Sequence, residues 1–156
     1  MVERAKQAAD LHTSTFVQAV ALELLRGGTM EERLPALRAF YRDQRDALAG
    51  ALEAEVGRER VRFVRPPGGM FLWARLPDGW DATELLRTAV EHGVAFVPGA
   101  PFFAHDPEVE TLRLSYSLLE PDRLVDAARR LAAAMDDAHG ERPRAERLGG
   151  AVFRQD

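Results

Sequence analysis

The sequence contains no cysteine, and this absence removes two kinds of chemistry. Disulfide bonds and thiolate metal ligands are both excluded, while the redox conditions in which the protein works stay open. The histidines lie far apart and without the spacing of metal ligands, at His12, His92, His105 and His139. We therefore expect no metal site.

Long apolar runs are missing as well. No stretch approaches the ~20 apolar residues of a transmembrane helix, and Met1-Val2-Glu3-Arg4 lacks the basic start and apolar stretch of a signal peptide. A net charge of −4, with acids and bases mixed along the chain, argues against general binding of nucleic acid or anionic membranes. We therefore expect a cytoplasmic protein with no nucleic-acid or membrane partner.

Lysine is nearly absent, since Lys6 is the only one and every other basic residue is arginine. The rest of the composition is that of a soluble globular protein, with 46% hydrophobic and 29% charged residues. A chain of 156 residues is long enough to bury a modest core.

The apolar pattern predicts an α+β fold. Helical spacing predicts helices over residues 2–10, 15–26, 30–56, 81–92 and 121–138. A period of two, or short apolar runs, predicts strands over residues 60–65, 70–76, 94–97 and 112–118. This order favours a small antiparallel or mixed sheet covered on one face by helices.

Four local features sharpen this expectation. Thr15 and Gln18 have the spacing of a capping box, and Pro35 should either end a short first turn or kink the long helix. The strand from Met70 to Leu76 is apolar on both faces apart from Arg75, so it should be largely covered. The helical pattern fails after residue 139, which predicts a loose tail.

Four segments together resemble the C-terminal part of class I/II (fold type I) aminotransferases, nearest to the 2-aminoadipate and aromatic aminotransferase branch. They are Lys6-Gln7-Ala8-Ala9-Asp10-Leu11-His12-Thr13, Arg65-Pro66-Pro67-Gly68-Gly69-Met70-Phe71-Leu72-Trp73, Val94-Ala95-Phe96-Val97-Pro98-Gly99-Ala100-Pro101-Phe102-Phe103 and Thr111-Leu112-Arg113-Leu114-Ser115-Tyr116-Ser117. The resemblance covers about residues 3–136. It implies a pyridoxal-phosphate enzyme that moves an amino group between an amino acid and a 2-oxo acid, and that acts as a homodimer.

Arg113 is the main candidate site residue. It stands between Leu112 and Leu114, and a buried guanidinium is costly unless it meets an anion, for which its planar fork suits a carboxylate. The resemblance implies that the arginine at this position binds the α-carboxylate of the substrate. A strand arginine that simply faces water is the alternative interpretation.

Three further segments are weaker candidates for contact with a substrate. Glycine in Pro66-Pro67-Gly68-Gly69 suits a tight turn, and the resemblance implies that Gly69 and Met70 line the substrate site. The loop around Phe102 and Phe103 either contacts substrate or packs as an ordinary loop. His12-Thr13-Ser14 resembles a segment near the active-site entrance, although helix capping by the two hydroxyls is the favoured interpretation.

The lysine that carries the cofactor in this family is absent. It lies in a serine-rich turn, whereas Lys6 matches a later lysine of the family pattern. We therefore expect residues 1–28 to be a remnant of the large cofactor-binding domain, residues 29–138 to be the small domain with its linking helix, and residues 139–156 to be a disordered tail.

Three functions stay open. The chain is a C-terminal aminotransferase fragment that is inactive alone and does not bind pyridoxal phosphate by itself, or a non-catalytic amino- or oxo-acid-binding or regulatory module. The third is the C-terminal part of a transcription regulator with an aminotransferase-like domain, although no winged-helix DNA reader is present.

Overall fold

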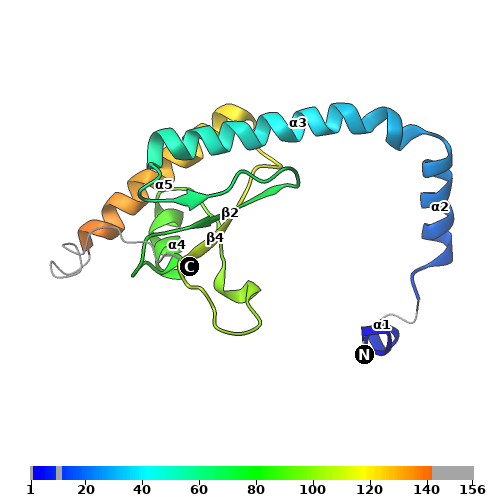
Figure 1. The fold of residues 1–156 in the computed structure, drawn as a ribbon, viewed down its shortest axis with the longest axis horizontal. Helices are drawn as coiled ribbons and strands as arrows, with labels where there is room; N and C mark the ends of the chain where they lie inside the picture. Colours follow the sequence, from blue (N-terminus) through cyan, green and yellow to red (C-terminus); the bar gives the residue numbers. More distant parts are fainter. Residues whose placement is uncertain (1, 10–11, 142–156) are drawn as a thin grey trace. The chain divides into compact units, whose positions relative to one another are not determined.

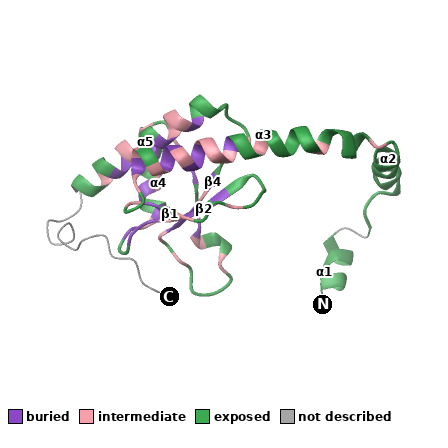
Figure 2. Ribbon diagram, turned by 45° about the horizontal axis from the view of Figure 1, so that its top comes forward, coloured by how far each residue is buried: buried purple, intermediate pink, exposed green. Residues whose placement is uncertain are grey.

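The computed structural model describes residues 2–9 and 12–141 of the chain (Figure 1). The chain divides into two compact units, residues 1–39 and 40–156. The first unit holds α1 (Val2–Ala9), α2 (Thr15–Arg26) and the beginning of α3 (Thr29–Ala51). None of its described residues is buried, and the apolar side chains of α2 are exposed along its length (Figure 2).

The second unit is an α+β layer, as the sequence predicts. The end of α3 continues into a π-helical turn, η1 (Leu52–Val56), and is followed by β1 (Arg62–Phe63), β2 (Phe71–Arg75) and α4 (Ala82–Glu91). The chain then forms β3 (Val97–Pro98), the short 3-10 helix η2 (Ala100–Phe102), β4 (Thr111–Ser115) and α5 (Pro121–Glu141). The strands pair antiparallel in the order β1-β2-β4-β3.

The core lies between one face of this sheet and the helices. Leu72 and Ala74 of β2 pair with Leu114 and Leu112 of β4, and all four are buried. The helices complete the core with apolar side chains that include Leu48, Leu52, Leu85, Leu124, Leu131 and Met135. Figure 2 shows the buried colour on the sheet, on parts of the helices and on some of the loops that join them. The other face of the sheet is therefore left without the α-helices that form this core.

This arrangement corrects the expectation that the strand from Met70 to Leu76 is covered on both faces. The burial of β2 alternates, and Phe71 and Trp73 are 41% and 39% exposed. Because all the helices that contribute to the core pack on the other face, the large apolar side chains of β2 stay partly open to solvent.

The predicted capping of α2 is wrong. The helix begins at Thr15, its N-cap is Ser14, and no side chain caps its free amides. Gln18 instead donates from Nε2 to the carbonyl of Thr13 at 2.9 Å. The capping interpretation of the Thr13 and Ser14 hydroxyls fails for the same reason.

Several predicted boundaries also move. The strand expected over residues 94–97 begins only at Val97, because the amide of Val94 still donates to the carbonyl of Ala89 at the end of α4. The strand expected over residues 112–118 ends at Ser115. The long helix runs through Pro35 without a break, so no short first turn ends there.

The C-terminal helix extends to Glu141 and therefore includes the first residues of the predicted tail. The rest of that tail, residues 142–156, lies outside the described residues. Within the described ranges, no helix is both long enough and apolar enough to cross a lipid bilayer.

Candidate functional site

The open face of the sheet carries Arg113 at its centre. In the antiparallel register Arg113 pairs with Trp73 of β2 on one side and with Val97 of β3 on the other. Residues directly opposite each other project to the same face, so this row lies away from the core. The alternation of β4 buries Leu112 and Leu114 and leaves Arg113 between them half-buried on the open side.

Aromatic rings surround the Arg113 guanidinium. Its central carbon lies 4.2 Å from the centroid of the Phe71 ring and 4.8 Å from that of Phe102. Its Nε is buried and has no hydrogen-bond partner. Cation–π contacts of this kind stabilise by about 0.5–2 kcal/mol, but they do not satisfy an N–H donor. The Arg113 guanidinium therefore has an N–H donor, at Nε, that has no acceptor among the described residues.

Arg75 on the same face is engaged differently. Its Nη1 lies 2.5 Å from a carboxylate oxygen of Glu110, and its Nη2 forms an ion pair with Glu108. The carbonyl of Glu110 also accepts from the amide of Leu76 at 2.9 Å. Arg75 is thus neutralised while it fastens the end of the 103–110 loop, whereas no ion pair to Arg113 occurs within the described residues.

Trp73 pairs with Arg113 across the sheet and also contacts the loop that follows β3. Its ring meets that of Phe102 edge-on with centroids 5.6 Å apart, and that of Phe103 at 6.1 Å. Phe102 is 51% exposed. The Phe102 and Phe103 loop, for which the sequence left packing and ligand contact equally open, therefore packs on β2 and also reaches the guanidinium.

The turn that contains Gly69 and Met70 leads into β2, and both residues are exposed. Gly69 has a φ of +93°, a conformation that residues with a Cβ seldom adopt. Tyr116 holds the turn in place: its amide donates to the Met70 carbonyl at 3.1 Å, and its hydroxyl donates to the Gly68 carbonyl at 3.3 Å. Burial raises the pKa of the Tyr116 phenol above its ordinary value, and the charge of Arg45 lowers it by less.

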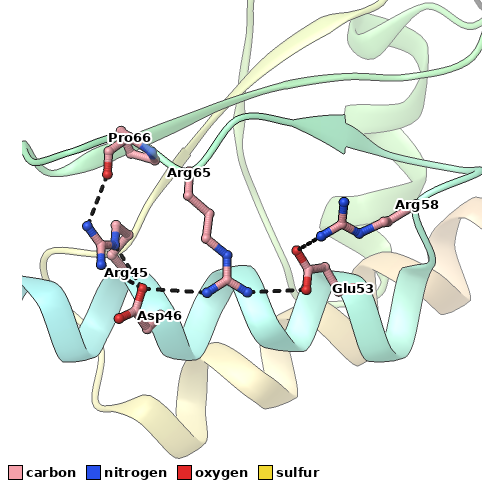
Figure 3. Close-up of polar contacts among 6 residues, drawn as sticks. All are labelled: Arg45, Asp46, Glu53, Arg58, Arg65 and Pro66. Carbon is pink, nitrogen blue, oxygen red and sulfur yellow. Dashed lines mark hydrogen bonds and ion pairs between the residues drawn. The ribbon is translucent and has the colours of Figure 1, made fainter.

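Ion pairs with α3 and η1 fix the other end of this turn (Figure 3). Arg45 donates to the Pro66 carbonyl at 3.1 Å and pairs with Asp46 at 2.8 Å. Arg65 reaches from the turn to Asp46 at 3.7 Å and to Glu53 at 3.2 Å. Much of this network is exposed, so we assign it the placement of the turn rather than a large stabilisation.

The three sequence-predicted site residues are therefore only partly brought together. The Met70 carbonyl accepts from the amide of Tyr116, which follows β4 and lies three residues beyond Arg113 in the chain. Neither Gly69 nor Met70 hydrogen-bonds to the Arg113 side chain among the described residues. A depression of about 520 Å³ lies farther along the same face, against Arg62, Trp73 and Arg75, and none of the three residues lines it.

Sequence analysis missed the aromatic neighbours of Arg113. The signal was present, because Phe71, Trp73 and Arg75 recur with a period of two and therefore share one face. The apolar character of both faces instead predicts a strand that is covered on both sides. The family likeness covered Phe71 and Phe102 but indicated no contact between them and the arginine.

These features belong to a known class of protein. The chain is a member of the class I and II aminotransferases, whose family model matches residues 2–131. It is 48% identical over 132 residues to the 2-aminoadipate transaminase of Thermus thermophilus, an alignment that covers 85% of this chain and 33% of that relative. It is 40% identical to the aromatic-amino-acid aminotransferase 1 of Thermococcus litoralis, over 87% of this chain and 32% of the relative.

A solved structure agrees with the fold. The alpha-aminoadipate aminotransferase of Thermus thermophilus aligns with a TM-score of 0.75 and 47% identity, over 86% of this chain and 34% of that one. That structure holds N-(5'-phosphopyridoxyl)-L-leucine, in keeping with the pyridoxal-phosphate dependence of the family. The chain spans about a third of the length of the curated relatives that it matches.

The residues present fit one part of such a reaction and not another. Covalent attachment of pyridoxal phosphate needs a lysine, and the second unit contains none, since Lys6 is exposed on α1 of the first unit. The buried, unpartnered Nε of Arg113 does fit an anionic group such as a carboxylate. The second unit therefore offers pyridoxal phosphate no lysine for covalent attachment, whereas its Arg113 has an N–H donor that suits an anionic group.

Proposed function

We propose that this chain is the C-terminal part of a pyridoxal-phosphate-dependent aminotransferase, and that its second unit binds the α-carboxylate of the amino-acid and 2-oxo-acid substrates through Arg113. In the complete enzyme the cofactor would supply the chemistry at the carbon that bears the amino group. The role of this chain is to hold and orient the substrate, with Gly69 and Met70 lining the site. As in the family, the complete enzyme would be a homodimer.

One observation carries the proposal: Arg113 has a guanidinium with an unsatisfied buried N–H and no carboxylate partner among the described residues. An N–H donor that is buried without an acceptor costs free energy. A substrate carboxylate would remove that cost with charge-assisted hydrogen bonds. Arg75, another arginine of this face, already has two acidic partners.

Calorimetric titration with L-leucine tests this role. We expect weak binding to the wild-type chain and at least a tenfold loss in Arg113→Ala, because hydrogen bonds to charged groups contribute about 1.5–3 kcal/mol. Arg87→Ala is the matched control, since Arg87 is an exposed arginine on α4 whose ion-pair partner among the described residues is Glu84. Equal affinity in wild type and Arg113→Ala, or no binding to either, would contradict the proposal.

We also propose that the chain alone is inactive and does not bind pyridoxal phosphate covalently, because its single lysine does not match the cofactor lysine of the family. Adding pyridoxal phosphate should then give no visible absorbance that depends on Lys6. The measurement compares wild type with Lys6→Ala after free cofactor has been removed. A band present in the wild type and lost in the variant would show that Lys6 carries the cofactor.

The second candidate is a non-catalytic module that binds amino or oxo acids or regulates a partner. It is supported by the second unit, which has a core of its own: the buried apolar residues among those described lie between Leu48 and Met135. The two candidates differ in what restores activity. Transaminase activity on addition of the missing two thirds of a homologous enzyme would favour the fragment, and ligand binding without such complementation would favour the module.

A further inference from the structure

The Arg113 guanidinium is held in place without an acidic partner. The carbon at its centre lies over two aromatic rings, Phe71 at 4.2 Å and Phe102 at 4.8 Å. We infer that Phe71 and Phe102 are positioning residues, which fix the guanidinium of Arg113 while leaving its charge and N–H groups available to a carboxylate. This inference rests on the proposed function for the identity of the ligand.

The rings approach Arg113 from both flanks of its strand. Phe71 belongs to β2, and Phe102 follows β3, and in the strand order these two strands lie on opposite sides of β4. Trp73, which pairs directly with Arg113, meets Phe102 edge-on at 5.6 Å and so limits where that ring can move. The long arginine side chain is thereby restricted from two sides.

Aromatic contacts suit this task better than acidic ones. A carboxylate beside a guanidinium would hold it firmly but would also occupy its donors and neutralise its charge, as Glu108 and Glu110 do for Arg75. A ring attracts the cation through its quadrupole and takes none of the N–H donors in a linear hydrogen bond. Since a restricted side chain loses less rotamer entropy when a ligand binds, the carboxylate is bound more tightly.

Arg75 and Arg113 therefore have different roles on the open face. Arg75, paired with Glu108 and Glu110, fastens the 103–110 loop, which begins directly after Phe102. Arg113, held by rings, keeps an unpartnered buried Nε. The difference in partners, rather than the difference in exposure, makes only one of them a binding group.

The experiment uses the full 156-residue chain with Phe71→Leu and Phe102→Leu, which keep apolar bulk and remove the ring. Phe103→Leu is the matched control, because Phe103 contacts Trp73 at 6.1 Å and makes no ring contact to Arg113. Two quantities are measured: the dissociation constant for L-leucine, and the exchange with water of the Arg113 Nε–H proton by NMR, assigned with Arg113→Lys. Melting temperatures establish that all variants are folded, as expected for side chains exposed by 41% and 51%.

We expect each Leu variant at positions 71 and 102 to bind L-leucine about three- to tenfold more weakly and to exchange the Nε–H proton faster. Phe103→Leu should match the wild type, and Phe102→Tyr, which restores a ring, should recover both readouts. Wild-type binding and wild-type exchange in both Leu variants would overturn the inference. Should the wild-type chain bind no L-leucine, the proposed function fails by itself, and the exchange rates alone still decide whether the rings position the guanidinium.

Discussion

At the scale of single residues, the environment of a side chain decides its chemistry more than its type does. Tyr116 illustrates this, because its ring is almost fully buried and its hydroxyl reaches the carbonyl of Gly68 in the turn. Burial disfavours the charged phenolate, so the pKa of Tyr116 is raised, with a smaller opposing contribution from Arg45. The folded chain thus keeps this proton at a pH where the unfolded chain begins to lose it.

Tyr116→Phe should therefore have an effect that depends on pH. Near pH 8 the variant should lose about 0.5–1.5 kcal/mol, the contribution of one hydrogen bond. Above the ordinary tyrosine pKa of about 10, the unfolded wild type gains stability by ionising Tyr116, so the advantage of the wild type should shrink as the pH rises toward the raised folded pKa. Urea unfolding of both proteins at pH 8 and pH 10.5 measures this, and a constant or growing difference would contradict it.

At the scale of elements, the short strand β3 depends on a close approach to β4. The amide of Gly99, just after β3, donates to the carbonyl of Thr111 at 2.7 Å. A Cβ at Gly99 would lie 2.0 Å from the Thr111 hydroxyl and 2.9 Å from its backbone carbon. Thr111 is completely buried and its hydroxyl donates to the Glu108 carbonyl at 2.7 Å, so the Thr111 side chain cannot easily move away from an added Cβ.

Gly99→Ala should accordingly push β3 and η2 away from β4 and destabilise the chain by about 1–3 kcal/mol, the usual cost of overpacking. Because η2 carries Phe102, L-leucine binding should weaken as well. Gly68→Ala is the control, since a Cβ there meets nothing within 4 Å. Thermal unfolding and calorimetry of both variants check the prediction, and equal melting temperatures would show that the contact with Thr111 relaxes freely.

At the scale of the whole molecule, the two units differ in how they are stabilised. The described residues of the first unit bury no side chain, and α2 exposes apolar residues that include Phe16, Leu24 and Leu25. The second unit has the buried core and all the strands found in the described residues. Burial of apolar surface dominates folding stability, so the second unit should carry nearly all of it.

Deletion of residues 2–28 should leave the melting temperature within a few degrees of the full chain and reduce self-association, because exposed apolar side chains are removed. The control retains residues 2–28 with Phe16→Ser and Leu24→Ser. Differential scanning calorimetry and analytical ultracentrifugation measure the two effects. Loss of the cooperative transition on deletion would show that residues 2–28 contribute to the core. Independent folding of the deleted chain would support the predicted division of residues 1–28 from residues 29–138.

The sequence alone determined the order of the elements and the place of Arg113 among them. Periodicity is local, so alternation along β4 places Arg113 on the face opposite to Leu112 and Leu114. The bounds of the short strands are predicted less accurately from the sequence. The strand predicted over residues 94–97 begins too early, because the amide of Val94 donates to a carbonyl at the end of α4, which the local pattern does not reveal.

Only the tertiary structure decided which arginine is available and which face of the sheet is open. Arg75 and Arg113 both stand on strands among apolar residues, and their partners come from segments far along the chain: Glu108 and Glu110 for one, Phe71 and Phe102 for the other. Such contacts depend on strand order and register, which set the neighbours of a side chain across the sheet. The charge left unsatisfied at Arg113 is therefore a property of the fold and not of any one segment.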